Sequence, residues 1–71
     1  MIKFDREVEW ILGQPNFDCM GIAQALRESG MDIERKSEKE QAAVIYWMLE
    51  MYELHKDKWR ERAAEFLMQV S

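Results

Sequence analysis

The chain has 71 residues, with 10 Lys and Arg against 14 Asp and Glu, and therefore a formal net charge of −4. This length provides one small domain, close to the lower limit for a single hydrophobic core, and it excludes Rossmann domains and barrels. One cysteine cannot form an internal disulfide, and one cysteine with one histidine cannot build a structural zinc site. We therefore expect residues 1–71 to form one domain with no metal and no cofactor.

The hydropathy of the chain predicts no membrane association. The longest mainly apolar stretch, 42–49, has 8 residues, whereas a membrane-spanning helix needs about 20. The N-terminal residues 1–7 include charged side chains and lack the apolar region of a secretory signal. We therefore expect a folded protein of the cytoplasm.

The first predicted helix covers about 5–12. Its apolar residues recur at the spacing of one helix face: Phe4, Val8, Ile11 and Leu12. Asp5 is placed to cap the first turn, and Gly13 followed by Pro15 ends the helix.

The second predicted helix covers about 17–29, with Asn16 or Asp18 as its cap. One face is apolar and consists of Cys19, Ile22, Ala23 and Leu26. Gly30 follows as the residue that adopts the left-handed conformation at the end of a helix, which glycine does without a Cβ penalty.

The third predicted helix covers about 38–55 and follows a capping-box pattern, in which Ser37 caps a backbone amide and Glu40 reaches back. It carries two apolar seams about 200° apart. One seam consists of Ala42, Ile45, Leu49 and Tyr52. The other consists of Val44, Trp47, Met51 and Leu54, and a more polar strip of Ala43, Tyr46, Glu50 and Glu53 lies between them. A helix that is apolar on two sides needs two packing partners.

The fourth predicted helix covers about 57–69. Its apolar seam consists of Trp59, Ala63, Phe66 and Val70. The break between the third and fourth helices falls at 55–57, but neither Gly nor Pro marks it, so one continuous helix over 38–70 remains an alternative. The four segments predict an all-α fold, a small bundle of three to four helices with a C-terminal helical hairpin.

The candidate reactive side chains favour structural roles over catalysis. Cys19 lies on an apolar helix face and His55 at a helix end, without the arrangement that activates a thiolate nucleophile. Glu50 and Glu53 share a strip but lack the repeated Glu-x-x-His pattern of metal-binding bundles. We expect no enzyme activity, no catalytic residue and no metal-ligating residue.

Binding of nucleic acid is the alternative function. The last predicted helix contains Lys56, Lys58, Arg60 and Arg62 around Trp59, and basic residues with an aromatic can bind single strands by stacking. The segment 22–26 also resembles the first helix of a helix-turn-helix, but Gly30 comes too late for its turn. The net negative charge disfavours phosphate binding, so we expect ion pairs on a solvated face instead.

Six Met and three Trp in this short chain favour protein–protein contacts, because both residue types are common at interfaces. Trp10 lies off the apolar stripe of its helix. We therefore take five residues as candidates for partner binding: Trp10, Val44, Trp47, Met51 and Leu54. The partner is either a different protein or a second copy that meets the second seam of the third helix in a homodimer.

Four stretches spread over residues 10–66 carry a family resemblance: Gln14-Pro15-Asn16-Phe17-Asp18-Cys19, Ile22-Ala23 with Leu26-Arg27, Glu40-Gln41-Ala42-Ala43-Val44-Ile45, and Trp59-Arg60. The chain resembles small accessory proteins of the lambdoid phage early region between the exonuclease and excisionase genes. The resemblance implies a phage or prophage origin, early expression in the bacterial host cytoplasm and a role in redirecting host physiology toward lytic development. The partner that it implies is a host protein. It implies no active-site residues.

Overall fold

The computed structural model describes residues 3–14 and 16–70, without the side chains of 16–18. Within that part of the chain there are four α-helices, one short 3-10 helix and no strand. The elements are α1 (Arg6–Leu12), α2 (Asn16–Glu28), α3 (Ser37–His55), the 3-10 helix η1 (Lys56–Lys58) and α4 (Trp59–Val70). The predicted all-α class is confirmed. Pro15, part of the predicted helix stop, lies outside the described residues. The cap predicted at Asn16 or Asp18 depends on side chains that are not described.

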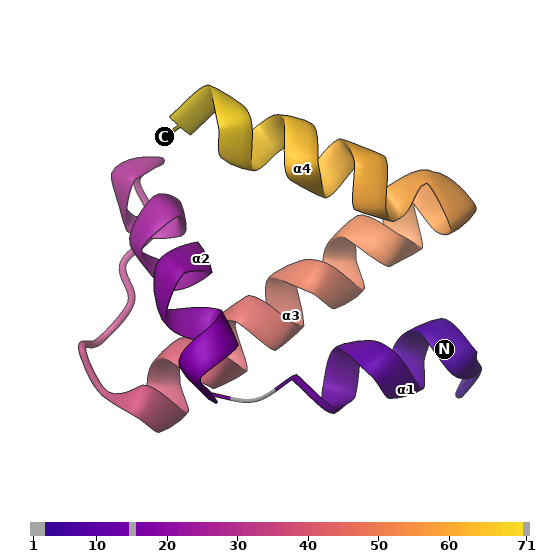
Figure 1. The fold of residues 1–71 in the computed structure, drawn as a ribbon, viewed down its shortest axis with the longest axis horizontal. Helices are drawn as coiled ribbons and strands as arrows, with labels where there is room; N and C mark the ends of the chain where they lie inside the picture. The colour runs from indigo at the N-terminus through magenta and orange to yellow at the C-terminus, as the bar shows by residue number, and fades with distance from the viewer. Residues whose placement is uncertain (1–2, 15, 71) are drawn as a thin grey trace.

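The helices are arranged around a hairpin. Figure 1 shows α3 and α4 as the two arms of a V, with α2 crossing its open end and α1 lying along the other side of α3. The C-terminal helical hairpin is therefore confirmed, with α3 as the helix that contacts all the others.

The first helix begins as its sequence predicts. The Asp5 carboxylate accepts a hydrogen bond from the Val8 amide at 3.0 Å, which satisfies one of the free amides of the first turn. The backbone amide of Gly13 donates hydrogen bonds to the carbonyls of Glu9 and Trp10, and these bonds end the last turn of α1. The buried face is narrower than predicted, because Val8 and Ile11 are buried whereas Phe4 and Leu12 are exposed.

The second helix ends at the predicted glycine. Gly30 has a φ of 111°, and the amide of Met31 donates to the carbonyl of Leu26 at 3.0 Å, so the chain turns back over the end of the helix. A residue with a side chain would be strained at this φ, so glycine is favoured at position 30.

The capping box predicted at Ser37 and Glu40 is wrong. Lys36 precedes the helix in an extended conformation, and no side chain caps the first turn of α3. Glu40 instead forms an ion pair with Arg27 of α2 at 2.8 Å. Its carboxylate therefore points toward α2 and does not accept a hydrogen bond from the backbone amide of Ser37, as the capping box requires. Arg27 also donates to the carbonyls of Ile33 and Glu34. The start of α3 is therefore fixed by a tertiary contact.

The chain breaks between α3 and α4 at Lys56, so the alternative of one continuous helix is wrong. Lys56 has a φ of 53°, the one positive φ among the described residues other than glycine. With a ψ of −125° it lies in a sparsely populated region of backbone conformation, which costs an L-residue roughly 1–3 kcal/mol. The packing of α4 back onto α3 and α2 offsets that cost.

All four helices contribute to one cluster of buried side chains. Its members are Ile11, Cys19, Ala23, Leu26, Val44, Trp47, Met48, Trp59 and Ala63. The rings of Trp47 and Phe66 lie 5.8 Å apart between centroids in a tilted arrangement, which joins the two arms of the hairpin.

Candidate functional site

Two of the five residues predicted to bind a partner lie in the core. Val44 is fully buried and Trp47 is 5% exposed, because α2 and α4 cover this face of α3. The prediction that these two side chains are available to another chain is wrong, since the second packing partner of α3 belongs to the same molecule. Met51 is half-buried and packs against the core. Trp10 and Leu54 are exposed, at 44% and 74%.

Trp10 is occupied by a contact within the molecule, although it is partly exposed. The guanidinium carbon of Arg60 lies 4.1 Å from the centre of the Trp10 ring and 5.0 Å from that of Trp59. Arg60 also donates to both carboxylate oxygens of Glu7, at 2.8 and 3.2 Å. These contacts fasten α1 to α4, so we assign Trp10 a structural role.

The same cluster bears on the nucleic-acid alternative. Trp59 is buried and its indole N–H donates to Glu7 at 3.3 Å, so its ring offers no face for a base to stack on. Arg60 is paired with Glu7, and Arg62 is paired with Glu65 at 2.9 Å. Trp59, the aromatic residue of the predicted stacking site, is therefore covered, and part of the positive charge around it is already paired.

A second polar cluster joins α1 to α3 and shifts the pKa values of its members. The Tyr52 hydroxyl donates to Asp5 at 2.6 Å, and this bond lowers the pKa of the Asp5 carboxyl below its ordinary value. The same bond, together with burial and neighbouring carboxylates, raises the pKa of Tyr52. In the first cluster, which joins α1 to α4, the hydrogen bonds from Arg60 lower the pKa of Glu7. At neutral pH each group is held in the charge state that its contact needs.

The most distinctive free surface is the side of α3 that faces away from the core. We call it the outer face of α3, and define it by Lys39, Ala42, Ala43, Tyr46, Leu49, Glu50, Glu53 and Leu54. Leu49 lies at the edge of this face and also packs against the core. Ala43 and Leu49 are half-buried, and the other six residues are exposed. Tyr46 is 65% exposed, which leaves most of a large aromatic side chain in water.

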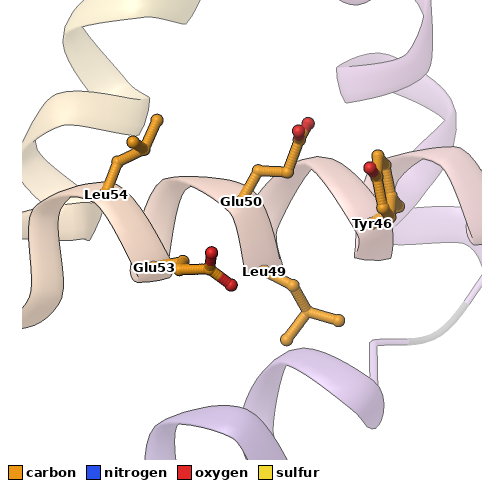
Figure 2. A pocket seen from close by; sticks show the side chains of 5 residues that line it. All are labelled: Tyr46, Leu49, Glu50, Glu53 and Leu54. Carbon is orange, nitrogen blue, oxygen red and sulfur yellow. The ribbon is translucent and has the colours of Figure 1, made fainter. Parts of the chain in front are cut away.

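A groove of about 270 Å³ runs along the C-terminal half of this face. It is lined by Tyr46, Leu49, Glu50, Glu53 and Leu54. Figure 2 shows all five side chains along one side of α3, with Leu49 extending toward α1. The groove therefore combines apolar side chains with two carboxylates. None of the ion pairs formed between described residues includes Lys39, Glu50 or Glu53.

The sequence interpretation missed this groove because it treated Tyr46, Glu50 and Glu53 as a solvated strip. The signal that could have found it is Tyr46 itself, a large aromatic between carboxylates on a helix with apolar residues on both sides. Leu54, the one exposed member of the predicted seam, belongs to the same groove.

A second hollow, of about 260 Å³, lies between α2 and α4 and is lined by Gly21, Ile22, Ala25, Leu67 and Met68. Its lining has no charged side chain, so it offers no charge pattern from which to define a ligand. Cys19 lies on the covered side of α2, fully buried.

Within residues 3–14 and 16–70, no group of His, Cys, Asp and Glu side chains is placed to hold a metal ion. No helix in the same part of the chain is both long enough and apolar enough to cross a membrane. The loop between α2 and α3 spans 29–36, which exceeds the three- or four-residue turn of a helix-turn-helix.

The fold and surface together define a small all-α protein with an apolar and acidic groove on its central helix. No known protein family, curated protein sequence or solved structure matches this chain.

Proposed function

We propose that this chain acts by binding another protein through the outer face of α3. The observation that carries the proposal is the groove, where Tyr46 and Leu54 remain mostly exposed beside the carboxylates of Glu50 and Glu53. Exposed apolar side chains rimmed by charge are typical of protein-binding surfaces, and tyrosine is enriched in them.

The composition of the groove indicates the chemistry of its partner. An apolar side chain of the partner fills the space over Leu49, and Lys or Arg residues beside it meet the two carboxylates. The resemblance to lambdoid phage early proteins adds a biological setting to the proposal. The partner is then a host protein in the bacterial cytoplasm, whose activity the chain modulates in favour of lytic development.

We propose binding, not catalysis, as the activity. The thiol of Cys19 is buried and therefore inaccessible to a substrate. The carboxylates of the groove lie on an open surface, where water screens the interactions that acid–base catalysis requires.

Affinity capture from a bacterial lysate tests the proposal, with the wild type compared with a Tyr46→Ala, Leu54→Ala double variant. We expect the wild type to retain a specific protein after nuclease treatment and the double variant to lose it. Met20→Ala is the matched control, because Met20 is an exposed apolar residue on α2. The captured protein, once purified, should bind the wild type and the control equally in calorimetry.

Equal capture by the double variant and the wild type contradicts the assignment of the surface. Retained material that disappears with nuclease supports the nucleic-acid alternative instead.

A further inference from the structure

We infer that α1 is a strap that opens separately from the rest of the fold, and that its opening extends the groove of α3 for a partner protein. The inference rests on the proposed function, because it concerns access to the same groove. Figure 1 shows α1 on one side of α3 and α4 on the other. The strap is defined as residues 5–14, which are α1 with the residues that flank it.

The strap covers one side of α3. Residues at intervals of three or four form a single row along a helix, and we call one such row the inner ridge: Gln41, Ile45, Leu49 and Tyr52. Both ends of the inner ridge are bonded to the strap. The side-chain amide of Gln41 donates to the carbonyl of Gln14 at 2.7 Å, and the Tyr52 hydroxyl donates to Asp5 at 2.6 Å. The part of the inner ridge between these bonds therefore faces the strap.

The inner ridge and the groove share Leu49. This side chain lines the groove and extends toward α1, as Figure 2 shows. Ile45, Leu49 and Tyr52 are all half-buried and pack against the core. When the strap leaves, the apolar surface of the inner ridge becomes continuous with the groove. An apolar side chain of the partner then has a larger surface to cover than the closed fold offers.

The strap is fastened by few groups. The buried side chains of α1 are Val8 and Ile11. Among the described residues, the side-chain hydrogen bonds that other helices donate to side chains of the strap all end on the carboxylate of Asp5 or Glu7. A helix of seven residues is too short to be stable in water by itself. The strap is therefore helical only while it is docked, and it leaves as one unit.

The other helices hold together without the strap. The rings of Trp47 and Phe66 join α3 to α4. The ion pair of Arg27 with Glu40 joins α2 to α3. Of the nine buried side chains in the core cluster, only Ile11 comes from α1. A terminal element that buries little opens more readily than the core, so the strap has its own opening equilibrium.

Hydrogen exchange of the full chain, followed by NMR at increasing urea concentration, tests whether the strap opens separately. The amides of Val8 and Glu9, which are both bonded to Asp5, report on the strap. We expect them to exchange at least about tenfold faster than amides in the middle of α3, with a smaller dependence on urea. Glu40→Gln weakens a bond that remains when the strap opens. This variant should accelerate exchange in α3 about tenfold and leave exchange in the strap unchanged.

Calorimetry with the captured partner protein tests whether the strap controls binding. Glu7→Gln removes the charge that pairs with Arg60 and keeps the size of the side chain. It should increase opening of the strap about threefold, because the ion pair is partly exposed. The affinity for the partner should rise by the same factor, since the apparent affinity scales with the open fraction. Glu65→Gln is the matched control, because it removes an equal charge from the pair with Arg62 within α4 and should change neither quantity.

Equal exchange rates in the strap and in α3 overturn the inference, because the strap then opens only when the whole fold opens. An effect of Glu40→Gln on both regions overturns it for the same reason. A partner affinity that Glu7→Gln leaves unchanged or lowers also overturns it. None of these results affects the proposed function, which fails instead if the Tyr46→Ala, Leu54→Ala variant captures the partner as the wild type does.

Discussion

Replacing Arg27 by methionine should destabilise the fold far more than the same change at the exposed Arg62. Arg27 makes three contacts that connect α2, the following loop and α3. Its guanidinium lies 2.9 Å from the carbonyl of Ile33, 3.0 Å from that of Glu34 and 2.8 Å from the Glu40 carboxylate. The side chains of Arg27 and Glu40 are only 12% and 14% exposed, so water replaces these contacts poorly. Methionine keeps most of the aliphatic part and removes only the charged group.

The expected loss is about 2–4 kcal/mol, because a hydrogen bond to a charged group contributes about 1.5–3 kcal/mol and an orphaned partner charge adds a penalty. A domain of this size has a free energy of unfolding of about 4–10 kcal/mol, so the loss is a large share. The melting temperature should fall by about 10–25 °C. Urea unfolding followed by circular dichroism at 222 nm measures the loss directly, with an unchanged slope confirming that the folded state is intact.

Arg62→Met is the matched control, because Arg62 pairs with Glu65 on an exposed surface and its loss should cost at most about 0.5 kcal/mol. Glu40→Gln removes the ion pair but keeps both carbonyl contacts, so its cost should fall between the two. Equal costs for Arg27→Met and Arg62→Met would refute the reasoning that the tertiary contact fixes the start of α3.

Three further predictions concern the stability of the fold. They involve the buried Trp47, Gly21 within α2, and the carboxylates of Asp5 and Glu7. Trp47→Ala should cost about 3–5 kcal/mol in urea unfolding, since Trp47 is buried, and a cost below 1 kcal/mol would show that the site is not packed. Gly21→Ala should raise the stability by about 1 kcal/mol, because a Cβ there meets no atom within 4 Å, and a lower urea midpoint would contradict this. Asp5 and Glu7 have lowered pKa values in the folded chain, so their contribution to stability is present above pH 4–5 and is lost as the pH falls through their folded values. A pH series of melting temperatures should show that decline, and Asp5→Asn should be less stable at neutral pH and less sensitive to acid.

Local signals predicted the helices well. The cap at Asp5 and the left-handed Gly30 were readable because each involves residues within a few positions of one another. The capping box at Ser37 failed for the opposite reason, since Arg27 lies ten residues before the start of α3 and competes for Glu40. The clusters around Glu7 and Tyr52 were missed for a similar reason. Their partners are far apart in the chain, and only the docking of α1 brings them together.

The sequence by itself determined that this chain is a set of amphipathic helices, where most of them begin and end, and that the longest is apolar on two sides. Only the tertiary structure decided which residues of α3 enter the core and which remain outside. Helical periodicity marks faces but does not say which neighbour covers each of them. The packing of α2 and α4 over Val44 and Trp47, together with α1 on the side of Tyr52, leaves the side of Tyr46 exposed. The candidate site is therefore the one face of α3 that no other helix of the described chain covers.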